Sequence, residues 1–245
     1  MWKDGFEKGI ERLRDPQIRA RLKREVAQGS QPDWTNFVFN AGAWGHVVLS
    51  NSAGERYRAY EGQDFATIGK TLGRDPADVA WDIIVEAKRG SWPSALYFMM
   101  SDADIKLALR APWTSIGTDA GASLAIGQPD GMGIRHPRVN GTFPRVLAHY
   151  VRDEGALTIE DAVRKMSSWP AERMGLHDRG LIREGMRADV VIFDLDRVKD
   201  DATYEKPLLP STGIDHVIVN GVPTILDGRY TGALAGMVLK NQCAR

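Results

Sequence analysis

The stretch APWTSIGTDAGASL, residues 111–124, carries the main clue to the fold of this chain. Its short apolar run TSIG, residues 114–117, predicts a strand, and Thr118 and Asp119 follow directly. In alternating β/α folds, catalytic and ligand-binding groups collect at the carboxyl ends of strands. Asp119 is therefore either a carboxylate that binds a metal or takes a proton, or an acid that caps the next turn.

Length and charge limit the classes of protein to consider. The chain has 245 residues, 43% of them hydrophobic, which is enough for one large domain with a sizeable core. Acidic and basic residues balance at 32 each, so the composition predicts no nucleic-acid partner and no membrane partner. No apolar run approaches the roughly 20 residues that span a bilayer, and the first residues do not resemble a signal peptide. A single cysteine, Cys243, permits no internal disulfide. We therefore expect a cytoplasmic protein.

The spacing of apolar residues predicts helices alternating with strands up to about residue 175. Asp-Pro pairs at 15–16 and 75–76 are typical of helix starts. Strands are expected at 36–40, at 46–50 and at 94–100, the last buried on both faces as in a parallel sheet. Further helices are expected at about 64–73, 105–110, 143–152 and 158–166, and from Pro170.

The last sixty residues have a different pattern, with short β segments separated by glycine turns. VIVNGVPTIL, residues 217–226, predicts a hairpin around Asn220-Gly221. The part before this module holds only three or four expected strands, whereas a closed barrel of this kind needs eight. The sheet is therefore either small and open or part of something larger.

Few other side chains form a pattern with chemical meaning. Arg138, in IRHPRVNGTFPR, is either a clamp for an acidic substrate group or a surface arginine. His149 falls inside a helical pattern and is expected to be a packed or exposed helix residue. The five histidines are too dispersed to predict a metal site by spacing, and GMG at 131–133 follows no strand.

Several segments together resemble a known family. TSIGTDAG, HPRVNGTFPRVL, IREGMRADVVIFD and TGALAG are similar to the carboxyl-terminal half of the D-aminoacylases, the N-acyl-D-amino-acid deacylases of the amidohydrolase superfamily. The resemblance implies an α/β fold, the later part of a metal-dependent (β/α)8 barrel followed by part of a small β-sandwich. We expect the barrel portion at 1–180 and the β-sandwich portion at 181–245.

The same resemblance implies a reaction and two site residues. The family hydrolyses the amide of an N-acyl-D-amino acid with water activated by zinc. Asp119 matches the aspartate that binds the metal and accepts the proton of this water. Arg138 matches the arginine that binds the α-carboxylate of the substrate. The N-acyl amino acid is thus the expected small-molecule partner.

The resemblance also implies missing parts. The family's cysteine and histidine zinc ligands precede the segment that this chain matches, and Cys243 does not replace them. We expect a truncated chain that is incomplete for catalysis alone. Two alternatives remain: a non-catalytic half that pairs with a separate N-terminal half, or a sibling amidohydrolase of the dihydroorotase or dipeptidase type.

Overall fold

The structure is a computed structural model that describes residues 3–88, 90–121 and 134–240. The chain forms two compact units, Met1–Ser101 with Pro129–Arg135 and Asp102–Gln128 with His136–Arg245. Each unit combines helices with an antiparallel sheet, so the expected mixture of α and β structure is confirmed. Cys243, the GMG motif and most of the loop after Ala120 lie outside the described residues.

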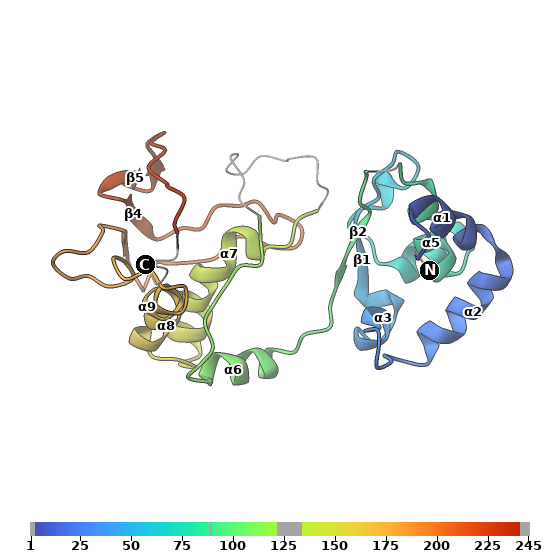
Figure 1. The fold of residues 1–245 in the computed structure, drawn as a ribbon, viewed down its shortest axis with the longest axis horizontal. Coiled ribbons are helices and arrows are strands. Elements are labelled where there is room, and N and C mark those ends of the chain that lie inside the picture. Colours follow the sequence, from blue (N-terminus) through green and yellow to red (C-terminus); the bar gives the residue numbers. More distant parts are fainter. Residues whose placement is uncertain (1–2, 89, 122–133, 241–245) are drawn as a thin grey trace. The chain divides into compact units, whose positions relative to one another are not determined.

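The first unit consists of short capped helices and a two-stranded sheet (Figure 1). Asp15 and Asp75 each accept a 2.8 Å hydrogen bond from the backbone N–H two residues further on, which confirms both predicted helix starts. Gly73 ends α4 with a φ of +63°, a conformation that glycine adopts without steric cost. The elements are α1 (Phe6–Arg14), α2 (Pro16–Ala27), α3 (Phe37–Asn40), η1 (Trp44–His46), β1 (Val47–Asn51), η2 (Arg58–Tyr60), α4 (Phe65–Leu72), α5 (Pro76–Glu86) and β2 (Ser94–Tyr97).

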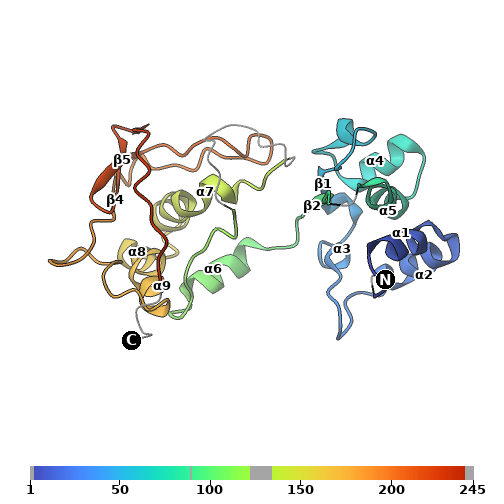
Figure 2. The same cartoon turned by 45° about the horizontal axis from the view of Figure 1, so that its top comes forward.

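The core of the first unit lies between the strand β1 and the helices α4 and α5. Val47 and Leu49 of β1 pack with Phe65 and Ile68 of α4 and with Val79 of α5. Each of these side chains is at most 4% exposed, and full burial of such a side chain stabilises a fold by about 1.5–3 kcal/mol. Figure 2 shows α4 and α5 side by side in this unit.

Two strand predictions in this unit are wrong in part or whole. Residues 37–40 form the helix α3 with Asn36 as its N-cap, because the Asn36 side chain accepts from the N–H of Phe39 at 3.0 Å and donates to the carbonyl of Val26 at 2.7 Å. This capping outweighs the β-rich composition. The run 94–100 forms only the short β2, which pairs antiparallel with β1 and is not buried on both faces. The strand expected at 46–50 is confirmed as β1.

The described residues of the second unit form five helical segments and a four-stranded sheet. The helix predicted at 143–152 begins earlier, at Arg138, and its second half is wound as a π-helix. Thr158 accepts from the N–H of Asp161 at 3.2 Å, as predicted for a cap. The elements are α6 (Asp102–Arg110), α7 (Arg138–Arg145), the π-helix η3 (Val146–Asp153), α8 (Ile159–Met166), α9 (Ser168–Arg173), β3 (Val190–Phe193), β4 (Ile214–Val219), β5 (Val222–Leu226) and β6 (Arg229–Tyr230).

The carboxyl-terminal sheet has the strand order β3-β4-β5-β6, with every pair antiparallel. Asn220 and Gly221 connect β4 to β5 with φ angles of +50° and +82°. A two-residue type I′ turn requires positive φ at both positions, and this twist suits a hairpin. The hairpin prediction is therefore confirmed, whereas the β-sandwich and its boundary at 180/181 stay predictions.

The strand predicted at 114–117 is wrong for the chain as described, since these residues lie in no strand. Both sheets of the described ranges are purely antiparallel, so no parallel barrel strands are present there. A buried parallel strand needs a hydrogen-bonding neighbour on both sides. Here the backbone of 111–116 is bonded instead by groups of α8 and by a side chain of α9. No helix in the described part of the chain is long and apolar enough to cross a membrane.

Candidate active site

Asp119 ends the irregular segment that follows α6. Its side chain is 88% exposed and its φ is +47°, which is uncommon for a residue with a side chain. The turn bond at this point is made by Thr118, whose hydroxyl accepts from the N–H of Ala120 at 3.3 Å. The turn-capping hydrogen bond that the sequence suggested for Asp119 is thus made by the Thr118 hydroxyl instead. The Asp119 carboxylate projects toward solvent.

Arg138 lies close to Asp119, although it comes nineteen positions later in the sequence. It is the first residue of α7, and its Nη2 lies 3.0 Å from Oδ2 of Asp119. The Arg138 side chain is 44% exposed, so part of the guanidinium faces solvent. The structure therefore brings together both of the site residues expected from the sequence.

His136 supports the start of α7. Its Nδ1 accepts from the backbone N–H of Arg138 at 3.0 Å, which leaves Nε2 to carry the ring proton and to donate to the Tyr204 hydroxyl at 3.1 Å. Burial and the nearby Arg138 charge both lower the pKa of His136, and the neutral ring fits this bonding pattern. Tyr204 was missed by sequence analysis, because only the fold brings it to residue 136.

The pair of Asp119 and Arg138 has a specific chemical capacity. A carboxylate accepts and returns protons, and a guanidinium binds a second carboxylate through its parallel N–H groups. Asp119 pairs with Nη2 of the Arg138 guanidinium, and the exposed remainder of this guanidinium can bind a substrate carboxylate. The arrangement combines a proton acceptor with an anion-binding group.

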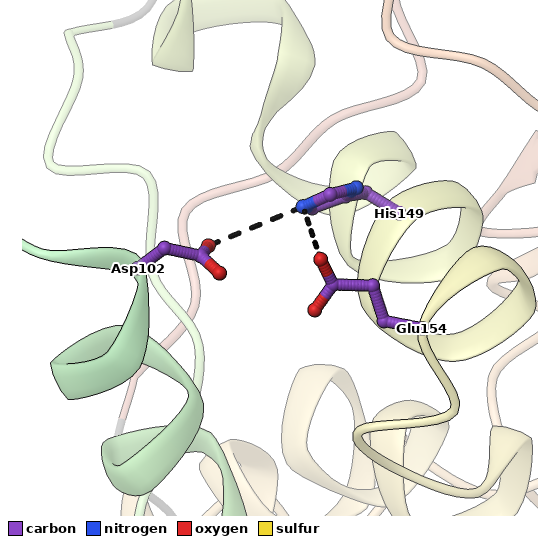
Figure 3. A group of neighbouring side chains, drawn as sticks. All are labelled: Asp102, His149 and Glu154. Atoms are coloured by element: carbon purple, nitrogen blue, oxygen red, sulfur yellow. Dashed lines mark ion pairs between the residues drawn. The ribbon is translucent and has the colours of Figure 1, made fainter.

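A second polar cluster of this unit joins α6 to the π-helix η3 (Figure 3). The Nε2 atom of His149 faces Glu154 Oε1 at 3.3 Å and Asp102 Oδ1 at 4.0 Å. His149 and Glu154 are five residues apart, a spacing that an α-helix puts on different faces. The π-helical bond from the N–H of Glu154 to the carbonyl of His149, 3.0 Å long, brings them to one face.

Lys106 fills the centre of this cluster. Its Nζ lies 2.8 Å from Asp102 Oδ2 and 2.9 Å from Glu154 Oε2, and the Tyr150 hydroxyl donates to Asp102 Oδ1 at 2.9 Å. Hydrogen bonds from Lys106 and then from Tyr150 lower the pKa of Asp102. Bonds to Asp102 and Glu154 raise the pKa of Lys106. Sequence analysis assigned His149 as a helix residue, and its ring indeed packs against Tyr150 with centroids 4.7 Å apart.

The fit of a metal ion differs between these two places. Zinc takes four ligands, or three and a water, at about 2.0–2.2 Å for nitrogen and oxygen. Among the described residues, Asp102, His149 and Glu154 are the one group of three suitable side chains within 4.8 Å, and the Lys106 ammonium is already paired with both of its carboxylates. Asp119 fits one ligand position, but the described residues around it do not complete a zinc site.

Comparisons with known proteins agree with the resemblance. Residues 55–225 match the amidohydrolase family. The D-aminoacylase of Alcaligenes xylosoxydans xylosoxydans is 40% identical over 179 residues, which cover 70% of this chain and 35% of that protein. The N-acyl-D-glutamate deacylase of the same organism is 40% identical over 153 residues, or 62% of this chain and 30% of that protein.

A solved structure is similar as well. The N-acyl-D-glutamate deacylase from Bordetella bronchiseptica, in complex with zinc and a phosphonate inhibitor, matches with a TM-score of 0.64 at 31% identity. The match covers 81% of this chain and 39% of that one. The chain thus spans about a third of the length of the curated relatives it matches. Because the family match covers most of its residues, the chain belongs to the amidohydrolase family.

Proposed function

We propose that this chain is the carboxyl-terminal part of an enzyme that hydrolyses N-acyl-D-amino acids to a carboxylate and a free D-amino acid. The observation that carries the proposal is the 3.0 Å contact between Asp119 and Arg138. It places a carboxylate able to move protons beside a cation able to hold the α-carboxylate of the substrate. The similarity to deacylases of N-acyl-D-amino acids supports this choice of substrate.

Each of the two residues has one role. Arg138 binds the α-carboxylate through the part of its guanidinium that Asp119 leaves exposed, and so orients the amide. Asp119 takes a proton from the attacking water at a carboxylate oxygen and gives it to the amide nitrogen as the amine leaves. Water then supplies the hydroxyl of the new carboxylic acid and the proton of the new amine, which balances the reaction.

Zinc is the proposed cofactor, and this chain contributes one carboxylate, Asp119, toward it. The metal, when bound, makes water a better nucleophile and polarises the amide carbonyl. The remaining ligands come from outside the described residues. The choice of zinc is supported by the Bordetella relative, which was solved in complex with zinc.

The architecture that fits this function is a (β/α)8 barrel shared with another segment. We infer that residues 1–180 belong to the barrel and residues 181–245 to the β-sandwich. The missing barrel strands come from the preceding part of the same enzyme or from a separate N-terminal half. A cytoplasmic location suits a chain whose single cysteine, Cys243, permits no internal disulfide.

The test is activity in the complete enzyme. The chain is expressed together with the remaining segment of the enzyme, the part that corresponds to the two thirds of its relatives that this chain does not match. Hydrolysis of N-acetyl-D-amino acids is then measured with added zinc. Asp119→Asn should lower kcat about 10²- to 10⁴-fold, the usual contribution of a general acid–base group. Asp196→Asn, a change at an exposed aspartate of the second unit, is the matched control and should leave kcat unchanged.

Three results would contradict the proposal. An Asp119→Asn enzyme with nearly full activity would remove the role of Asp119. Hydrolysis of cyclic amides in preference to N-acyl-D-amino acids would favour a dihydroorotase-type enzyme. An assembly that binds zinc but hydrolyses neither substrate class would favour the non-catalytic half.

A further inference from the structure

The segment that leads to Asp119 is held in an unusual way. Four consecutive backbone carbonyls, those of residues 111–114, accept hydrogen bonds from side chains of α8 and α9. Lys165 donates to Ala111 and, at 3.3 Å, to Thr114. Arg164 donates to Pro112 at 3.0 Å, and the indole N–H of Trp169 donates to Trp113 at 3.1 Å.

The support extends beyond these carbonyls. The backbone N–H of Ile116 donates to the carbonyl of Lys165 at 3.1 Å. The Ile116 side chain packs against the core that contains Leu109 and Val151. The last of these contacts lies three residues before Asp119, so a short, tethered segment carries the carboxylate.

Lys165 is the central residue of this support. Its side chain is 0% exposed although it carries a formal charge, and a buried ammonium is tolerated only when its N–H groups are bonded. An ammonium has three donors, and three acceptors surround it here: two carbonyls and the Asp161 carboxylate, 3.7 Å away. Only a segment with both carbonyls turned toward α8 satisfies this geometry. The buried charge therefore selects one conformation of residues 111–114.

We propose that the pair of helices α8 and α9 sets the position of Asp119, with Lys165 as the positioning residue. The catalytic meaning of this inference rests on the proposed function, whereas the tethering itself does not. Arg138 lies on a different element, α7, and the contacts of Lys165 go to Ala111, Thr114 and Asp161. Loss of Lys165 should therefore disturb proton transfer more than substrate binding.

The direct test is amide hydrogen exchange in the chain itself, followed by mass spectrometry in peptides that cover residues 113–121. Lys165→Met keeps the length and apolar stem of the side chain and removes its three donors. Exchange of the Ile116 amide should become about 10- to 100-fold faster, as expected for the loss of hydrogen bonds to a charged group. Lys199→Met is the matched control, because Lys199 is exposed in the same unit, and it should leave these peptides unchanged.

A milder variant covers the case in which Lys165→Met does not fold. Trp169→Phe keeps an aromatic ring and removes only the N–H that bonds to Trp113. Exchange in the same peptides should accelerate about threefold or more, the effect of one neutral hydrogen bond. Unchanged exchange in the folded Lys165→Met chain, or in Trp169→Phe where Lys165→Met does not fold, would overturn the inference.

Kinetics separate this inference from the proposed function. In the complete enzyme Lys165→Met should lower kcat about tenfold or more and leave KM within about twofold. A rise in KM with kcat unchanged would overturn the positioning role. If Asp119→Asn leaves the activity intact, the proposed function fails, and the exchange result still decides whether α8 and α9 tether the segment.

Discussion

Two polar clusters of the second unit resemble functional sites in opposite ways. Asp102, Lys106, His149 and Glu154 form the denser group, with two carboxylates and an imidazole around one ammonium. Within the described ranges Asp119 forms its ion pair with Arg138, and its side chain is 88% exposed. The dense cluster is already satisfied by its own lysine, whereas the sparse pair leaves donors and acceptors for a ligand. We therefore expect unused bonding capacity, rather than the density of ionisable groups, to mark the place where a ligand binds.

Among variants that compare the two clusters, the largest expected effect is on substrate binding. In the complete enzyme, Arg138→Ala should raise KM for N-acyl-D-amino acids about 10- to 100-fold, because a charge-assisted bond to the α-carboxylate is lost. Lys106→Ala removes a cation from the satisfied cluster and should leave KM unchanged. Steady-state kinetics of both variants test this contrast. Equal rises in KM would show that Arg138 has no special contact with the substrate.

The second prediction concerns metal binding by the dense cluster after its lysine is removed. In the chain itself, Lys106→Ala removes the ammonium that lies within 2.9 Å of both carboxylates. The vacated group of one imidazole and two carboxylates should bind zinc or cobalt about tenfold more tightly than the parent chain, because a neighbouring positive charge no longer repels the ion. Calorimetric titration measures the change. The double variant Lys106→Ala/His149→Ala is the control, and equally tight binding by it would place the ion elsewhere.

Local chemistry explains what could be predicted from the sequence. The caps at Asp15, Asp75 and Thr158 and the turn at Asn220-Gly221 depend on neighbouring residues alone, and the structure confirms them. The strand at 36–40 failed because a single asparagine bonds across the turn and outweighs β-rich composition. The prediction of a strand buried on both faces at 94–100 was wrong because the apolar pattern of the segment does not specify which strands pair with it. In the structure β2 pairs antiparallel with β1.

The candidate site was predictable only in part. Asp119 and Arg138 carried a recognisable chemistry and a resemblance, and their contact places them together. Lys106, Lys165 and Tyr204 gave no signal, because each has a hydrogen-bond partner that only the fold brings close. These partners, Glu154, Ala111 and His136, lie 48, 54 and 68 residues away in the sequence. The π-helical turn that pairs His149 with Glu154 could not be predicted either, because a search for side chains three or four residues apart does not pair residues that are five apart. Contacts of this kind arise from tertiary packing.

A third prediction concerns stability. Tyr150 is 4% exposed and its hydroxyl donates to Asp102 at 2.9 Å, so Tyr150→Phe should lower the free energy of unfolding by about 1 kcal/mol. Asp119 is an exposed residue, so Asp119→Asn should change that free energy by less than about 0.5 kcal/mol. Urea unfolding of the two variants provides the measurement. A larger loss in Asp119→Asn than in Tyr150→Phe would contradict the assignment of the dense cluster to structure.

The smallest expected effect is a change in the pH dependence of the dense cluster. The pKa of Asp102 lies below its ordinary value, chiefly because of the hydrogen bond from Lys106 and then that from Tyr150. A carboxyl whose pKa is lower in the folded state favours folding above its unfolded pKa, and this contribution is lost as the pH falls through the folded pKa. Lys106→Met should therefore raise the titration midpoint of Asp102, measured from its carboxyl carbon by NMR, toward the ordinary value.

The control for this titration is Asp194 in the same chain. Its pKa is also lowered, by a hydrogen bond from Arg197 and then by the backbone N–H of Asp196, and neither partner contacts Lys106. Lys106→Met should leave the Asp194 midpoint in place while that of Asp102 rises. If both midpoints stay unchanged, Lys106 is not the cation that satisfies the dense cluster. The distinction between a saturated cluster and an open pair would then lose its physical basis, because Asp102 and Glu154 would be as free as Asp119 to receive a ligand.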